Sequence, residues 1–296
     1  MSQAVELSVL RPRRSVLYMP GANARAMEKA RGLDTDVVIF DLEDAVAPDV
    51  KAEARDKVID SLRQGGYGNR ELVVRINPLA TPWGKDDLLA LLKADVDFDG
   101  ICMPKVESAE QVQTVAALIE QNTTRKLGLW PMIETPLGVA NAQQIAAAHS
   151  TLTAIVMGTS DLAKEMRIPH TPDRVGFISA LSQCVLAARC HQVDIIDGVY
   201  LDIKDSDGFV RICQQGRDLG FDGKSLIHPA QLTQANRVFG PSAEDVDKAR
   251  RIQEVWQEAL AEGKGVAVLD GKLVENLHAD EAERTLAIAD AIAARN

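Results

Sequence analysis

The sequence contains no apolar run that approaches the roughly 20 residues of a membrane-spanning helix. Residues 1–21 carry their basic cluster in the middle, with no long apolar block before it, which is not the pattern of a secretory signal. The cysteines show no CxxC spacing, so we expect reduced thiols in a cytoplasmic protein and no zinc site. They are Cys102, Cys184, Cys190 and Cys213.

Positive charge is also scarce. The chain has 33 Lys and Arg against 43 Asp and Glu, a net charge of -10, and no sustained basic stripe. This balance argues against a nucleic-acid-binding protein. Hydrophobic residues make up 46% of the 296 residues, which is enough for one large domain or for a domain with an appendage.

The dinucleotide-binding motif GxGxxG does not follow the first predicted strand. Apolar runs without polar alternation recur along the chain and alternate with amphipathic stretches, which is typical of strands covered on both faces. The predicted strands are 15–19, 37–40, 72–76, 100–104, 127–133, 153–158, 195–201 and 223–227. Eight strands separated by helices favour an α/β fold of the (β/α)8 TIM-barrel type over an open doubly wound sheet.

The pattern changes near residue 240. A Gly-Pro break precedes a long predicted helix over 242–263, and the segment 266–274 predicts a hairpin around Asp270-Gly271. Another helix closes the chain. We therefore expect a catalytic barrel over 1–240 and a small helix–hairpin–helix appendage over 241–296, packed on a neighbouring subunit.

Charged residues follow the predicted strands at the end where barrel enzymes place their chemistry. In chain order they are Asp41, Glu43 and Asp44, then Arg75, Lys105, Glu134, Asp161 and His228. Glu134 and Asp161 follow adjacent strands, so their carboxylates can converge. Oxygen ligands without a nearby His or Cys suit Mg²⁺, which takes one or two protein carboxylates and keeps several waters. Glu43 and Asp44 could then hold those waters.

Each of these residues also has a structural interpretation. Asp161 could be a helix N-cap, and Glu134 could be a solvated loop carboxylate. The acidic cluster after the second strand could pair with nearby Arg or Lys residues. His228, which precedes a proline, could be a packed loop histidine. A buried guanidinium such as that of Arg75 requires an anion, either a structural carboxylate or a ligand.

Six sequence blocks together resemble a known family. They are RSVLYMPGANARAMEKA, FDLEDAVAPDVKAEAR, VVRINP, PMIETPLGV, GTSDLAKE and FDGKSLIHPAQL. In order and spacing they are similar to the citrate lyase beta-subunit-like branch of the HpcH/HpaI aldolase superfamily, which includes malyl-CoA and citramalyl-CoA lyases. The resemblance implies an Mg²⁺-dependent barrel enzyme that makes or breaks a C–C bond between an acyl-CoA and a 2-oxo acid.

The resemblance also implies roles for individual residues. Glu134 and Asp161 match the metal ligands, Arg75 matches the substrate-binding and catalytic arginine, and Glu43 and Asp44 match the acidic pair near the metal waters. Further substrate contacts are implied for Glu134 itself, for His228, and, at the CoA phosphates or thioester, for Arg14, Arg25 and Lys29. The family forms homotrimers or homohexamers in which the appendage covers a neighbour's site.

One position departs from the family pattern. The CoA lyases carry an acid/base Asp in the appendage, whereas Glu275 stands at that place in DGKLVENLH, one methylene longer. The resemblance implies retro-Claisen cleavage of a 3-hydroxyacyl-CoA such as citramalyl-CoA or malyl-CoA to acetyl-CoA and a 2-oxo acid. The alternatives are a citryl-thioester lyase subunit of a citrate lyase complex, an aldolase for free hydroxy-oxo acids, and a non-catalytic CoA- or metabolite-binding protein.

Overall fold

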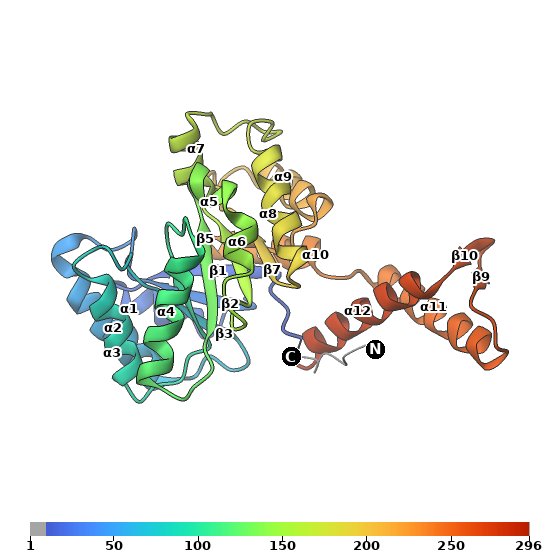
Figure 1. Cartoon of the computed structure of the whole chain (residues 1–296), viewed down its shortest axis with the longest axis horizontal. Coiled ribbons are helices and arrows are strands. Elements are labelled where there is room, and N and C mark those ends of the chain that lie inside the picture. Colours follow the sequence, from blue (N-terminus) through green and yellow to red (C-terminus); the bar gives the residue numbers. More distant parts are fainter. Residues whose placement is uncertain (1–9, 296) are drawn as a thin grey trace. The chain divides into compact units, whose positions relative to one another are not determined.

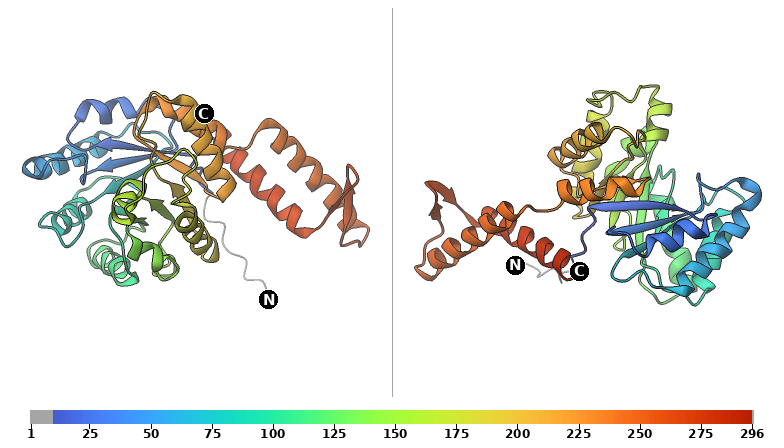
Figure 2. Two further views of the ribbon diagram at one scale, coloured as in Figure 1. Left: turned by 90° about the horizontal axis from the view of Figure 1, so that it is seen from above. Right: turned by 180° about the vertical axis from the view of Figure 1, so that it is seen from behind.

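The computed structural model describes residues 10–295 and contains a closed barrel of eight parallel strands (Figures 1 and 2). The strands are β1 Ser15–Pro20, β2 Val37–Asp41, β3 Glu71–Arg75, β4 Gly100–Met103, β5 Gly128–Ile133, β6 Ala154–Met157, β7 Asp194–Asp197 and β8 Gly223–Leu226. They pair in chain order, and β1 closes the barrel against β8. The predicted TIM barrel is therefore confirmed. β7 is shorter than the predicted 195–201, because the chain leaves the sheet after Asp197.

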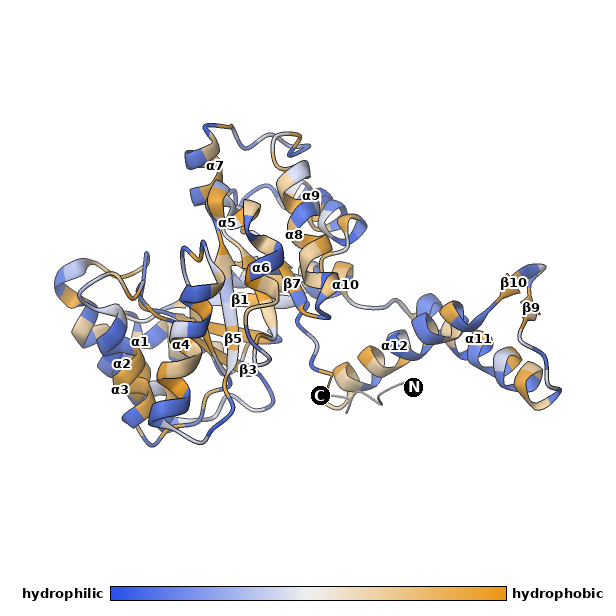
Figure 3. Cartoon of the chain, in the orientation of Figure 1, coloured by the Kyte–Doolittle hydropathy of each residue, from blue (hydrophilic) through white to orange (hydrophobic). Residues whose placement is uncertain are grey.

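Helices surround the strands, as the left view of Figure 2 shows. They are α1 Ala24–Ala30, α2 Lys51–Gln64, α3 Gly84–Lys93, α4 Ala109–Asn122, α5 Pro136–Ala140, α6 Ala142–Ala146, α7 Thr159–Met166, α8 Ile178–Cys190, α9 Ser206–Leu219 and α10 Leu232–Phe239, with 3₁₀ turns η1 Pro48–Val50 and η2 Pro229–Gln231. Figure 3 shows hydrophobic residues on one side of these helices and hydrophilic residues on the other. This amphipathic pattern buries one face of each helix against the sheet.

Two apolar layers result from the alternation of side chains along the strands. On β2, Val38 and Phe40 belong to the large core between strands and helices. Val37 and Ile39 belong to a second cluster, which fills the barrel interior together with the fully buried Trp130. The interior is thus a packed core and positions the strand ends rigidly.

The N-terminal end of the barrel is closed by a buried arginine. The Arg13 guanidinium lies 4.9 Å from the ring centroid of Trp130 and donates two hydrogen bonds of 2.8 Å to Glu71. It also pairs with Asp194 at 3.0 Å. Glu71 and Asp194 are the first residues of β3 and β7, so these charges neutralise one another at the end of the barrel opposite the predicted site.

The chain divides into two compact units, residues 13–239 and a second unit that contains residues 240–295. In the second unit α11 Ala243–Ala261, the antiparallel hairpin of β9 Ala267–Leu269 and β10 Lys272–Val274, and α12 Asn276–Ala293 follow one another. This succession confirms the predicted helix–hairpin–helix. A small cluster of Trp256, Val274 and Ala279 forms its core.

The described part of the chain contains no helix long and apolar enough to cross a membrane. All four cysteines are free thiols, and three of them are buried. Residues 1–9, which belong to the N-terminal segment interpreted above, lie outside the described residues.

Candidate active site

Asp41 and Arg75 form the centre of the polar cluster at the carboxyl ends of the strands. They are the last residues of β2 and β3 and lie opposite each other in the sheet register. Arg75 Nε donates to Asp41 Oδ1 and Arg75 Nη2 to Asp41 Oδ2, both at 2.7 Å. The structural interpretation is therefore confirmed for Asp41: its counter-ion is an arginine. Because both groups are buried, this fork fixes the guanidinium plane.

The rest of the Arg75 guanidinium faces further anions and a ring. Arg75 Nη1 lies 3.0 Å from Glu43 Oε2 and 3.9 Å from Asp44 Oδ2, and the guanidinium lies 4.9 Å from the ring centroid of Tyr18. Burial lowers the pKa of Arg75, but Asp41 and Glu43 outweigh burial, and the pKa is raised overall. Arg75 is therefore a permanently charged, preoriented donor at the barrel mouth.

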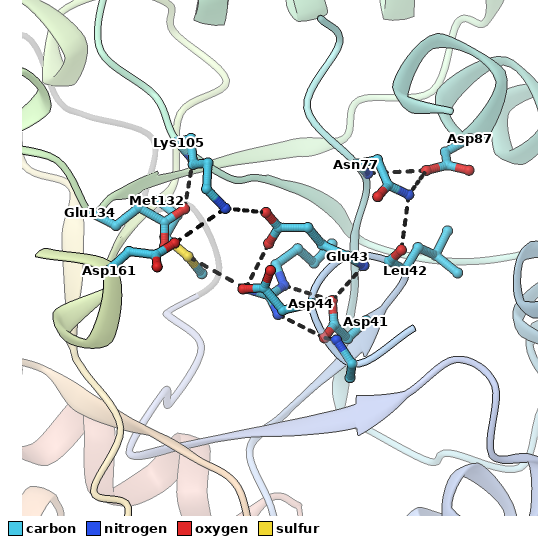
Figure 4. A network of polar contacts seen from close by, with 12 residues as sticks. Asp41, Leu42, Glu43, Asp44, Asn77, Asp87, Lys105, Met132, Glu134 and Asp161 are labelled. Carbon is cyan, nitrogen blue, oxygen red and sulfur yellow. Dashed lines mark hydrogen bonds and ion pairs between the residues drawn. The ribbon is translucent and has the colours of Figure 1, made fainter. Parts of the chain in front are cut away.

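Lys105, which follows β4, contacts three carboxylates (Figure 4). Its backbone N–H donates to Glu134 Oε1 at 2.7 Å. Its Nζ donates to Glu43 Oε1 at 2.6 Å and lies 3.2 Å from Asp161 Oδ2. The backbone is left-handed at this residue, with φ of 52°. The sequence shows Lys105 at a strand end, but it assigns no role to the residue.

Glu134 is held at the end of β5 and is only 3% exposed. Gly158, the residue after β6, makes room for it, because a Cβ there would lie 2.3 Å from Glu134 Oε2. Burial, followed by the charge of Glu43, raises the pKa of Glu134 to about 8. A buried carboxylate with this pKa lacks sufficient positive charge around it.

Asp161 lies in the first turn of α7, and its side chain is 29% exposed. No hydrogen bond caps α7 through a side chain, so the N-cap interpretation is wrong for this residue. Lys105 Nζ contacts both Asp161 and Glu43, and Lys105 N–H holds Glu134. The side chains of Glu134 and Asp161 therefore point to the same region, as Figure 4 shows.

These residues fit a hard cation. The available donors are carboxylate oxygens, which Mg²⁺ prefers. Glu43 Oε2 is buried without a hydrogen bond, because its 3.0 Å contact with Arg75 is an ion pair outside hydrogen-bond geometry. Within residues 10–295 no three His, Cys, Asp or Glu side chains converge as a complete metal site. Mg²⁺ held by Glu134 and Asp161 would therefore need water and substrate oxygens to complete its coordination.

Buried polar residues beneath the site fix the loop after β2. Lys51 is 6% exposed and donates to the carbonyls of Leu42 and Glu43 at 3.0 and 2.9 Å. Asn77 Nδ2 donates to the Leu42 carbonyl at 2.9 Å and to Asp87 at 2.6 Å. These contacts, part of which Figure 4 shows, hold the backbone of Leu42 and Glu43 in place. The sequence analysis did not find them, since their partners are mostly main-chain atoms.

Two of the predicted CoA-binding residues line a groove on the outside of the barrel. Arg25 and Lys29 are on α1 and line a groove between α1 and α2 together with Lys57. The β1–α1 loop adjoins the site, because Gly21 N–H donates to the carbonyl of Asp41 at 2.8 Å. The groove presents these three cations, and the acidic side chains of Glu28 and Asp60 line it as well.

The structure does not bring Arg14 to that end of the barrel. Arg14 precedes β1 and forms two hydrogen bonds of 2.9 Å with Asp36, which precedes β2. Because both residues stand before their strands, this buried pair lies at the N-terminal end.

His228 and Glu275 both lie at turn or helix starts. His228 follows β8, is exposed, and accepts a hydrogen bond from Ala230 N–H at 3.1 Å through Nδ1. Glu275 is the exposed N-cap residue of α12, where its N–H donates to His278 Nδ1 at 3.0 Å. Because His228 is exposed, its interpretation as a packed loop histidine is wrong. Glu275 belongs to the second unit.

The family model of the HpcH/HpaI aldolase/citrate lyase family matches residues 14–229. The chain therefore belongs to this family, and it is an enzyme of the citrate lyase beta-subunit type, consistent with a carbon–carbon lyase. The match confirms the resemblance seen in the sequence.

Individual relatives extend over nearly the whole chain. A protein of Cereibacter sphaeroides named (3S)-malyl-CoA thioesterase is 53% identical, with 96% of both chains covered. The citrate lyase subunit beta of Leuconostoc mesenteroides is 36% identical, with 95% of this chain and 94% of the relative covered. A crystal structure of CitE from Mycobacterium tuberculosis with magnesium, acetoacetate and coenzyme A superimposes with a TM-score of 0.75 at 28% identity, covering 93% and 97% of the chains.

Proposed function

We propose that the chain is an Mg²⁺-dependent enzyme that binds the CoA thioester of a 3-hydroxy acid of the malyl type and hydrolyses the thioester. The observation that carries the proposal is the fixed Arg75 guanidinium beside the convergent carboxylates of Glu134 and Asp161. The 53% identity to a protein named (3S)-malyl-CoA thioesterase supports hydrolysis as the reaction.

Glu134 and Asp161 would hold the metal, and Glu43 with Asp44 would hold its waters. Bound Mg²⁺ supplies Lewis-acid polarisation of the substrate's carboxylate and hydroxyl oxygens and fixes their positions. The CitE protein of Mycobacterium tuberculosis has been crystallised with magnesium and oxaloacetate, which supports this chemistry in a relative 29% identical over 77% of this chain.

Arg75 would stabilise charge on the thioester oxygen. When water attacks the thioester carbon, the carbonyl oxygen becomes an oxyanion, and a preoriented donor lowers the barrier. The C–S bond then breaks as the carbonyl re-forms, and CoA leaves as the thiolate, which takes up the proton that the attacking water released. Malyl-CoA plus water thus gives malate plus CoA.

Carbon–carbon cleavage is the second candidate, and the 36% identity to citrate lyase subunit beta favours it. Retro-Claisen cleavage places negative charge on the same thioester oxygen, now as an enolate, so Arg75 could serve both reactions. The difference lies in the proton removed: that of an attacking water in hydrolysis and that of the substrate hydroxyl in cleavage. This second candidate includes the role of a citryl-thioester lyase subunit in a citrate lyase complex.

The CoA portion would extend along the groove between α1 and α2. Arg25, Lys29 and Lys57 line it and outnumber the acidic Glu28 and Asp60, so the charge of the groove suits the pyrophosphate and the 3′-phosphate. Arg14 is not part of the proposed site, because it lies at the opposite end of the barrel.

We further propose a homotrimer or homohexamer. The second unit exposes large apolar side chains, Val266, Val268, Leu273 and Leu277. The barrel mouth exposes others near the strand ends, Leu137, Leu201, Ile203 and Ile227. Burying one set against the other in a neighbouring copy would remove both from water and bring Glu275 of that copy to the mouth as an acid/base.

The decisive experiment is a product analysis. Purified protein is incubated with (3S)-malyl-CoA, citramalyl-CoA or citryl-CoA, with Mg²⁺ or with EDTA. CoA, acetyl-CoA, the free hydroxy acid (malate, citramalate or citrate) and the 2-oxo acid (glyoxylate, pyruvate or oxaloacetate) are quantified. Hydrolysis predicts equal amounts of malate and CoA from malyl-CoA, only with Mg²⁺. Glyoxylate with acetyl-CoA would establish the second candidate instead. No turnover of any of these thioesters would refute both.

A further inference from the structure

We propose that the ammonium group of Lys105 is a resident counter-ion of the metal-free site, which gives up Asp161 when Mg²⁺ binds and thereby lowers the metal affinity. This inference rests on the proposed metal site at Glu134 and Asp161. It concerns a residue to which neither the sequence pattern nor the family resemblance gives a role.

The geometry of Lys105 carries the inference. Nζ lies between Asp161 Oδ2, at 3.2 Å, and Glu43 Oε1, at 2.6 Å, while the N–H of the same residue lies 2.7 Å from Glu134 Oε1. One residue thus contacts both proposed metal ligands and one proposed water-holding carboxylate. The backbone of Lys105 is left-handed, with φ of 52°.

The charge of the ammonium has a clear electrostatic effect. Without a cation, the carboxylates of Glu43 and Asp161 lie near each other in a partly buried site, and Glu134 can ionise there only against their negative charge, which opposes folding once it is ionised. Lys105 offsets this repulsion. A dication between Glu134 and Asp161 would do the same, but it would repel the ammonium, so the two cations compete for Asp161.

The two carboxylates that hold Nζ are not equivalent. Glu43 makes the shorter contact and has a side chain only 6% exposed, whereas Asp161 makes the longer contact and is 29% exposed. Lys105 itself is 40% exposed, so its ammonium can be solvated during the exchange. The Asp161 contact is therefore the weaker one, and Glu43 would retain the ammonium after metal binding.

Lys105 is accordingly a positioning residue. Removal of its charge should increase the Mg²⁺ affinity and lower the stability of the metal-free protein. Lys105→Met keeps the aliphatic stem and removes the charge, so the variant should bind Mg²⁺ about tenfold more tightly, given one unit charge near a dication. Its melting temperature in EDTA should fall, whereas saturating Mg²⁺ should largely restore it. A residue that only supports the fold would lower the melting temperature equally in both conditions.

The experiment measures Mg²⁺ binding by titration calorimetry and thermal unfolding with EDTA or Mg²⁺. Lys105→Arg keeps the charge and should bind Mg²⁺ within about threefold of the wild type. Lys105→Gly removes the charge but accepts the left-handed backbone, so it separates the ammonium from backbone strain. Lys164→Met is the matched control, because Lys164 is an exposed lysine on α7, and solvent screening should keep its effect below about twofold.

The outcomes are distinguishable. If the wild type binds no Mg²⁺, the proposed metal site itself is wrong. If the wild type binds Mg²⁺ and Lys105→Met binds it equally or less tightly, the metal site stands and the competition by Lys105 is refuted. Tighter binding by Lys105→Met and Lys105→Gly, together with unchanged binding by Lys164→Met, supports the inference.

Discussion

Arg75 and Asp41 end two neighbouring strands and are joined by two parallel hydrogen bonds of 2.7 Å. Each satisfies a buried charge of the other, so neither is free to rotate. The pair therefore presents the third guanidinium nitrogen, Nη1, in a fixed direction toward Glu43. The Arg75–Asp41 pair thus contributes both to the stability of the fold and to the proposed catalysis, and substitution of Arg75 can distinguish the two contributions.

Arg75→Lys should reduce kcat by roughly 100-fold, because an ammonium cannot bind Asp41 with two hydrogen bonds and also stabilise an oxyanion. Steady-state kinetics and thermal unfolding of the same preparation measure the two effects. Arg14→Lys is the matched control, since Arg14 forms the same two-bond fork with Asp36 at the opposite end of the barrel. A normal kcat in a folded but less stable Arg75→Lys protein would show that the arginine is purely structural.

Gly158→Ala should weaken Mg²⁺ binding by at least about tenfold, with a parallel loss of activity. The new Cβ would lie 2.3 Å from Glu134 Oε2 and 2.4 Å from Glu134 Cβ, so Glu134 must move. Displacing a ligand in this way has effects at least as large as those of outer-shell changes. Gly32→Ala adds the same methyl with its nearest neighbour at 3.9 Å and should bind Mg²⁺ normally. Equal affinities in the two variants would contradict the role of Glu134.

The metal-free protein should lose stability as the pH rises from about 5 to 8. The pKa of Glu134 is raised to about 8 in the folded protein, first by burial and then by the charge of Glu43, so the folded state binds the proton more tightly than the unfolded chain. Stability is then highest below the pKa of the unfolded chain and falls as the pH rises through the pKa of the folded protein. Between these two pKa values the loss is about 1.4 kcal/mol for each step of one in pH.

Chemical denaturation in EDTA at several pH values measures this slope. Glu134→Gln should reduce it, because the amide does not titrate. Mg²⁺ affinity of the wild type should increase over the same interval, since a protonated carboxyl is a poor ligand. A flat profile in EDTA would show that Glu134 is already ionised without metal.

Glu275→Gln should reduce turnover while leaving Mg²⁺ binding unchanged, because the proposed ligands all lie on the barrel. Glu283→Gln, another exposed change on α12, should be neutral. Mixed oligomers of Glu134→Ala and Glu275→Ala chains should regain part of the activity, since some sites would contain both intact residues. Absence of recovery, despite demonstrated subunit exchange, would exclude Glu275 as a group shared between copies.

The sequence predicted the barrel because apolar strands covered on both faces have a strong local signature. It also brought Asp41, Glu43, Arg75, Glu134 and Asp161 to one end, since parallel strands share their direction. The same rule, applied to residues before a strand, would have placed Arg14 at the other end.

The remaining features depend on contacts that sequence does not encode locally. The left-handed backbone of Lys105 is not apparent from its residue type, since non-glycine residues rarely adopt it. The fork between Asp41 and Arg75 requires the register of β2 and β3. Lys51 acts on main-chain carbonyls, so no side-chain pattern reveals it.

Two of the arginine–aromatic contacts of the barrel lie at opposite ends of its axis. Arg13 covers Trp130 at one end, Arg75 covers Tyr18 at the other, and packed apolar side chains lie between them. These side chains block the barrel axis, so a bound molecule enters and departs by one mouth. The fragment held deepest, the hydroxy acid at the strand ends, is then expected to depart after CoA, and the order of release is imposed by the architecture of the barrel.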